Sequence, residues 1–175
     1  ELNKDGELNK DYELNKDGEL NKNNELNKDK TALIHEDIVN MLPKGTILTP
    51  HIKELSRLIN MPIKEIITNL LEISGKCTDN NELIFVIKDS RTIASYKEAA
   101  YINTSGNNGM STGGSGDVLT GIIGAFIGGG LSSWEAARLG VYIHGLAGDK
   151  AAEKKGCYSM MASDIIEALP EVLEK

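Results

Sequence analysis

The sequence predicts an α/β fold, and three observations lead to that prediction. The run ELIFVIK at 82–88 is continuously apolar and rich in β-branched residues, which is typical of a buried strand. In 51–59, Ile52, Leu55 and Ile59 fall on one face of a helix. Further strand-like and helix-like segments follow along the rest of the chain. Because the strands are few, we expect the sheet and its helices to be one part of a larger α/β layered structure.

The remaining elements follow from local start and stop signals. Pro43 and Gly45 end a first helix, and Pro62 begins a later one. Two short β-prone runs come after the central strand, and the glycine triplet at 128–130 ends the next helix. The predicted helices are 31–42, 51–59, 62–75, 115–129, 132–154, 161–168 and 170–174, and the predicted strands are 46–49, 82–88, 91–95 and 99–103.

The first thirty residues are copies of one hexamer, ELNKDG and close variants. Its leucines recur every six residues, a spacing that forms no single stripe on a helix. A calcium loop is excluded, because its twelfth position requires Glu and the sequence has Tyr12 there. We therefore expect 1–30 to be a low-complexity, disordered tail and 31–175 to form the domain.

Composition argues against several classes of function. The 175-residue chain has a net charge of −7, which argues against a nucleic-acid partner. No apolar run is long enough to cross a membrane, and no secretory signal is visible. Cys77 and Cys157 lack the CxxC spacing of a metal or redox site. We expect both to be free thiols in a reducing, cytoplasmic compartment.

A polar loop rich in glycine precedes the helix predicted at 115–129. Glycine allows positive φ and close approach of backbone N–H groups to a ligand, and a helix N-terminus attracts anions. Asp117 lies in the first helical turn, where it could simply cap the helix. A cap does not require so many glycines, and a carboxylate beside a phosphate needs a purpose. We therefore predict a phosphate-handling site in which Asp117 takes a proton from an attacking hydroxyl.

These residues carry a resemblance to a known family. NTSGNNGMSTGGSGDVLTGII resembles the signature of the ADP- or ATP-dependent NAD(P)H-hydrate dehydratases, repair enzymes of the ribokinase-like superfamily. ILTPHIKELSRLI, IKDSRTIAS and CYSMMASDIIEALP resemble three further segments of that family. The resemblance covers about residues 32–173. It implies a ribokinase-like three-layer α/β/α sandwich, of which this chain holds the C-terminal half behind the repeat tail.

The resemblance also implies an activity and a set of site residues. The family phosphorylates the hydroxyl of NAD(P)H hydrate with ADP or ATP and Mg²⁺, and loss of phosphate restores the dinucleotide. Asp117 would be the catalytic residue and contact the hydrate, together with His51. No residue is expected to bind a metal directly. The adenine nucleotide would be bound by Lys88, Asp89, Ser90, Arg91, Thr92, Gly113, Gly114, Ser115 and Gly116.

Several residues have a second interpretation. His51 sits at a strand–helix junction, where it could cap the helix. Glu54 could help hold a hydrated Mg²⁺, although a capping role is favoured. We expect His35 and His144 to be structural, and the small residues around His144 indicate close helix packing.

Two departures from the family pattern affect these expectations. Asp89 stands where the family usually has Gly, so a turn with positive φ would be strained, and its charge would weaken nucleotide binding. The family domain is also longer than the matched region. We therefore expect this chain alone to have impaired activity, and a homo-oligomer, or a partner, to supply the missing half. The alternative functions are a ribokinase-like small-molecule kinase and a non-catalytic nucleotide-binding remnant that acts as a scaffold.

Overall fold

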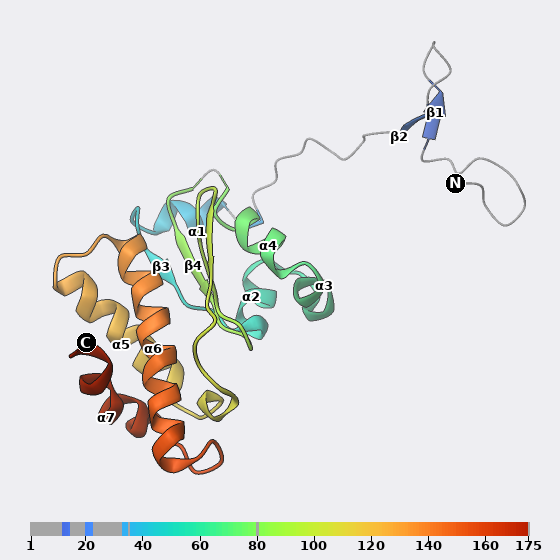
Figure 1. Ribbon diagram of the computed structural model, residues 1–175. Coiled ribbons are helices and arrows are strands. Elements are labelled where there is room, and N and C mark those ends of the chain that lie inside the picture. Colours follow the sequence, from blue (N-terminus) through green and yellow to red (C-terminus); the bar gives the residue numbers. More distant parts are fainter. Residues whose placement is uncertain (1–11, 15–19, 23–32, 35, 80, 175) are drawn as a thin grey trace, which may run out of the picture. The chain divides into compact units, whose positions relative to one another are not determined.

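A computed structural model describes residues 12–14, 20–22, 33–34, 36–79 and 81–174 (Figure 1). The chain divides into two compact units, 1–31 and 32–175. In the first unit, β1 (Tyr12–Leu14) pairs with β2 (Leu20–Lys22) in antiparallel fashion. The rest of the predicted tail lies outside the described residues.

The second unit contains a four-stranded mixed sheet in the order β3-β4-β5-β6. β3 is parallel to β4, and the remaining pairs are antiparallel. The β4 residues alternate between the two faces, so that Phe85 and Ile87 enter one core while Ile84 and Val86 enter another. The four predicted strands correspond to β3 (Ile47–Leu48), β4 (Ile84–Ile87), β5 (Ile93–Tyr96) and β6 (Ala99–Ile102).

Helices cover both faces of this sheet, as Figure 1 shows. On one side lie α1 (Glu36–Met41), α2 (Ile52–Leu58), α3 (Ile63–Thr68) and α4 (Leu70–Lys76). On the other side lie α5 (Ser115–Gly128), α6 (Ser133–Lys155) and α7 (Ala162–Leu173), and a 3₁₀ turn, η1 (Asn108–Met110), precedes α5. The predicted α/β layer structure is therefore confirmed.

Two helix predictions were wrong. The single helix predicted at 62–75 is interrupted at Asn69, whose φ of −125° and ψ of 30° are not helical. The two helices predicted at the C-terminal end are one, because α7 continues through Pro170. Burial of Ile165 and Ala168 holds that amphipathic helix together despite the missing N–H.

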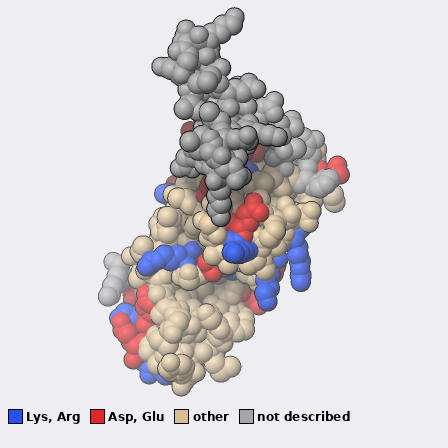
Figure 2. Space-filling model, turned by 90° about the vertical axis from the view of Figure 1, so that its right-hand side faces the viewer, with Lys and Arg blue, Asp and Glu red and all other residues tan. Residues whose placement is uncertain are grey.

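No helix among the described residues is long and apolar enough to cross a lipid bilayer. On the face shown in Figure 2, basic and acidic side chains are interspersed, in keeping with the net charge of −7.

Candidate functional site

The glycine loop turns into α5 at Gly114. This residue has a φ of +89°, a conformation that glycine adopts without strain. Its carbonyl accepts hydrogen bonds from the N–H groups of Asp117 and Val118, each at 3.0 Å. In the described part of the chain, the N–H groups of Gly113 and Gly114 have no backbone acceptor. They are therefore available to an anion at the positive end of α5.

Lys88 places a positive charge against the start of α5. Its N–H donates to the Pro50 carbonyl at 2.8 Å, and this bridge continues the parallel pairing of β3 and β4. Its Nζ atom lies so close to Gly116 that a Cβ there would be 3.1 Å away. Gly116 thus leaves room for the ammonium group beside the anion-binding end of the helix. The resulting combination of cation and helix N-terminus suits a phosphate.

His51 and Glu54 lie next to Lys88 and cap α2 reciprocally. The Glu54 N–H donates to His51 Nδ1 at 3.1 Å, and the His51 N–H donates to Glu54 Oε2 at 2.8 Å. The same Oε2 atom is 4.0 Å from Lys88 Nζ. The hydrogen bond from the His51 backbone, followed by the charges of His51, Lys88 and Arg57, lowers the pKa of Glu54. The structure thus gives Glu54 the favoured capping role, and contact of His51 with the hydrate stays a prediction.

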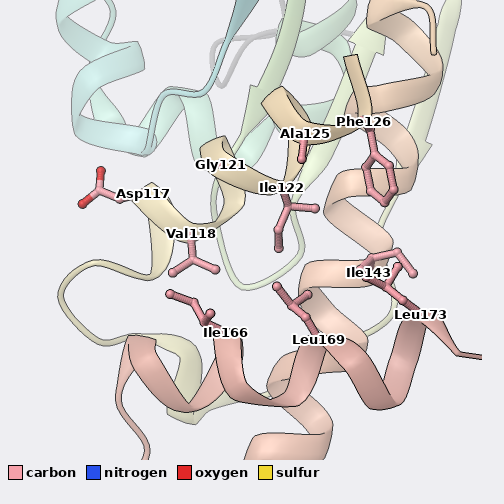
Figure 3. A pocket seen from close by; sticks show the side chains of 10 residues that line it. All are labelled: Asp117, Val118, Gly121, Ile122, Ala125, Phe126, Ile143, Ile166, Leu169 and Leu173. Carbon is pink, nitrogen blue, oxygen red and sulfur yellow. The ribbon is translucent and has the colours of Figure 1, made fainter. Parts of the chain in front are cut away.

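Asp117 is exposed on the first turn of α5. Figure 3 shows its carboxylate pointing away from the apolar side chains of α5 and α7. Among the described residues, its carboxylate makes no hydrogen bond or ion pair, so the carboxylate does not cap the helix. An exposed, unpaired carboxylate one residue beyond Gly116 is chemically able to accept a proton.

The segment 88–92 forms the turn between β4 and β5. Lys88 of this segment lies against Gly116 at the start of α5, and Asp89, Ser90 and Arg91 are exposed. The strain considered for Asp89 is absent, because Asn60 and Lys97 are the only described non-glycine residues with positive φ. The Thr92 carbonyl accepts a hydrogen bond from the Asn103 N–H at 2.9 Å.

His144 lies behind the loop and is buried in α6. Its Nε2 atom is 3.3 Å from the hydroxyl of Ser115. Burial lowers its pKa to about 4, although a hydrogen bond with the Ser115 backbone opposes that change. His144 is therefore neutral near pH 7, in line with the structural role expected for it. His35 lies outside the described residues.

Sequence reasoning missed the residues that hold the loop from behind. Asp149 and Asn107 connect the loop to α6 through side-chain hydrogen bonds. The signal that could have found them is the pair of glycines in HGLAGD, which we interpreted as helix packing. In the structure, Gly145 and Gly148 admit loop atoms instead.

An apolar hollow of about 480 Å³ separates α5 from α7 (Figure 3). Val118, Ile122, Ile166 and Leu169 line it, and Asp117 belongs only to its rim. An apolar lining cannot solvate phosphate charges, so this hollow is not suited to an anion.

Comparison with known proteins gives matches both in sequence and in fold. The sequence model of a family described as NAD(P)H-hydrate dehydratase matches residues 20–171. The bifunctional NAD(P)H-hydrate repair enzyme Nnr of Moorella thermoacetica is 40% identical over 153 residues, which cover 81% of this chain and 29% of that protein.

Two solved structures share the fold. The ADP/ATP-dependent NAD(P)H-hydrate dehydratase of Bacillus subtilis, co-crystallised with ATP and Mg²⁺, superposes with a TM-score of 0.70 at 26% identity. A ribokinase-like superfamily protein of Enterococcus faecalis gives a TM-score of 0.64 at 33% identity. The matches cover 73% and 75% of this chain, but only 47% and 45% of those structures. This chain thus spans less than half the length of these relatives, and it belongs to the NAD(P)H-hydrate dehydratase family.

Proposed function

We propose that this chain takes part in the ADP- or ATP-dependent dehydration of NAD(P)H hydrate in the cytoplasm. The observation that carries the proposal is the position of Lys88 Nζ against Gly116, at the start of α5 and one residue before Asp117. A phosphate-binding cation, a helix N-terminus and a free carboxylate thereby meet in one place. Phosphoryl transfer to a hydroxyl requires these groups.

In the proposed reaction, Lys88 and the N–H groups of the glycine loop hold the terminal phosphates of the nucleotide. Asp117 takes the proton of the hydrate hydroxyl as its oxygen attacks the terminal phosphorus. The new O–P bond forms while the bond to the nucleotide leaving group breaks. Inorganic phosphate then leaves with cleavage of the C–O bond, and a proton lost from the neighbouring carbon restores the double bond.

Mg²⁺ is proposed to enter with the nucleotide. Within the described residues, no three His, Cys, Asp or Glu side chains are grouped to hold a metal. Glu54 is already engaged with the His51 N–H. The usual arrangement of Mg²⁺ on substrate phosphates and water, with few protein ligands, fits this donor set. When bound, the ion would neutralise charge on the transferred phosphoryl group.

A complete site is proposed to need polypeptide beyond the matched region, because the Bacillus relative is about twice as long as the part that this chain covers. That polypeptide could belong to the same protein, to a second copy in a homo-oligomer or to a partner. Whichever of these supplies the additional polypeptide, the described residues are proposed to provide the nucleotide site and the base.

The test is conversion of NADH hydrate to NADH by the purified protein with Mg²⁺ and either ADP or ATP, followed through the near-ultraviolet absorbance of NADH. Nucleotide-dependent recovery of absorbance supports the proposal. Phosphorylation of other small alcohols without recovery of NADH would indicate a small-molecule kinase. Nucleotide binding without any turnover, in a protein that includes the polypeptide beyond the matched region, would indicate a non-catalytic remnant.

Lys88→Met is expected to weaken ADP or ATP binding about tenfold, because it removes a charge-assisted contact with phosphate. Isothermal titration calorimetry measures the change. Lys44→Met is the matched control, since Lys44 pairs with Glu82 at 2.7 Å and has no place in the site. Equal affinities of the two variants would show that Lys88 does not contact the nucleotide.

A further inference from the structure

Helix α6 presents two glycines to the segment that leads into the glycine loop. A Cβ on Gly145 would lie 2.1 Å from Ser105 Oγ and 2.8 Å from the Ser105 backbone carbon. A Cβ on Gly148 would lie 2.3 Å from Met110 Sδ. These distances are shorter than any relaxed contact, so the segment lies directly on the backbone of α6. The segment and the helix are therefore in close contact at both glycines.

Asp149 fixes the start of the loop. Its Oδ2 atom accepts a hydrogen bond from the Gly106 N–H at 2.9 Å, and its Oδ1 atom accepts one from Asn107 Nδ2 at 3.0 Å. Gly106 has a φ of +101°. A single carboxylate thus accepts hydrogen bonds from both the backbone and a side chain at the start of the loop.

Asn107 connects Asp149 to the next residues of the loop through hydrogen bonds of its side chain. Its Nδ2 atom also donates to the Gly148 carbonyl at 2.9 Å. Its Oδ1 atom accepts from the Gly109 N–H at 3.0 Å, which fixes η1. The side chain therefore connects α6 to the residues that immediately precede the anion-binding glycines.

His144 fixes the end of the loop through the contact of its Nε2 atom with Ser115 Oγ at 3.3 Å. Ser115 is buried at the first position of α5. His144 and Asp149 are five residues apart on one helix, about 7.5 Å along its axis. The loop is thus attached at both ends to a single rigid element.

We propose that Asp149 and His144 are positioning residues that together set the shape of the phosphate loop at 106–115. Asp149 acts on its start and His144 on its end. With both ends held, the N–H groups of Gly113 and Gly114 are kept directed outward before any anion binds. The inference rests on the proposed function only in that this loop receives the phosphates of a nucleotide.

Hydrogen exchange of the ligand-free protein tests the shape of the loop directly. Asp149→Asn keeps only one of the two acceptor oxygens, so either the Gly106 N–H or the Asn107 amide loses its partner. We expect exchange at Gly106 and throughout 109–115 to accelerate about tenfold or more, with β4 amides unchanged. The matched control is Glu135→Gln, which weakens the cap at the other end of α6, about 21 Å away. It should leave exchange at 106–115 as in the unaltered protein.

A second pair of variants tests the other attachment. His144→Leu replaces the imidazole with an apolar side chain and removes the contact with Ser115, whereas His144→Gln keeps a hydrogen-bonding group at this position. Exchange at 112–115 should accelerate in the first and be restored in the second. If exchange changes only at Gly106 in Asp149→Asn, or if the Leu and Gln variants agree, the two residues form local contacts and the proposal fails.

Nucleotide titration then separates this inference from the proposed function. We expect Asp149→Asn to weaken ADP binding about tenfold while Glu135→Gln binds within a factor of about two of the unaltered protein. Loss of loop protection without any ADP binding by the unaltered protein would overturn the proposed function and leave the positioning role supported. Unchanged affinity in Asp149→Asn would overturn the link between loop shape and binding.

Discussion

Asp117→Asn is expected to lower kcat for nucleotide-dependent recovery of NADH by about 10²- to 10⁴-fold, the usual contribution of a positioned general base. Asn matches the shape of Asp but cannot accept the hydroxyl proton. Nucleotide affinity should hold or increase slightly, because a negative charge beside the phosphates disappears. Stopped-flow absorbance gives kcat, and calorimetry gives the dissociation constant.

The matched control for this experiment is Asp164→Asn. Asp164 is also an acidic residue in the first turn of a helix, but its Oδ2 atom accepts the Met161 N–H at 2.8 Å and so caps α7. The control should lose some stability and keep kcat. Equal rates for Asp117→Asn and the unaltered protein would contradict the role of Asp117 as the base.

Acidification is expected to destabilise the protein through His144. Its folded-state pKa of about 4 lies below the ordinary value of 6.5, so protons bind the unfolded chain more readily than the folded one. The contribution to stability is complete above pH 6.5 and is lost as the pH falls toward 4. The difference between the two pKa values corresponds to about 3 kcal/mol of unfolding free energy.

Urea unfolding between pH 7 and pH 4 measures this loss, and His144→Gln provides the comparison because Gln does not titrate. The lowered pKa of Glu54 also affects stability in acid, but it contributes equally to both proteins. The stability difference between them should therefore change steadily across the window from 6.5 to 4. Parallel pH profiles would show that His144 is not buried in its neutral form.

The sequence predicted the strands and the loop well because their signals are local. The apolar run at 83–87 is short and rich in β-branched residues, which favours a buried strand over a helix. The glycines before Asp117 likewise indicate that the backbone at their own positions needs positive φ or close approach to other atoms. Such features need no knowledge of what packs against them.

The failures came from features that depend on the neighbouring elements. Apolar residues continue at helical spacing across Asn69, so periodicity could not show the break there. Pro170 is tolerated because α7 packs through Ile165 and Ala168, which no local rule reveals. The attachment of the loop by Asp149 was hidden for the same reason, since it joins residues 43 positions apart.

The attachment of the loop to α6 also determines when the site appears during folding. The contacts that hold the loop join residues separated by 29 to 43 positions, so they are made only after α6 has packed against the loop. A partly folded chain with only its sheet and α2–α4 in place would thus have no competent nucleotide loop. Nucleotide would bind the finished structure alone, and by mass action it would stabilise the native chain over every precursor.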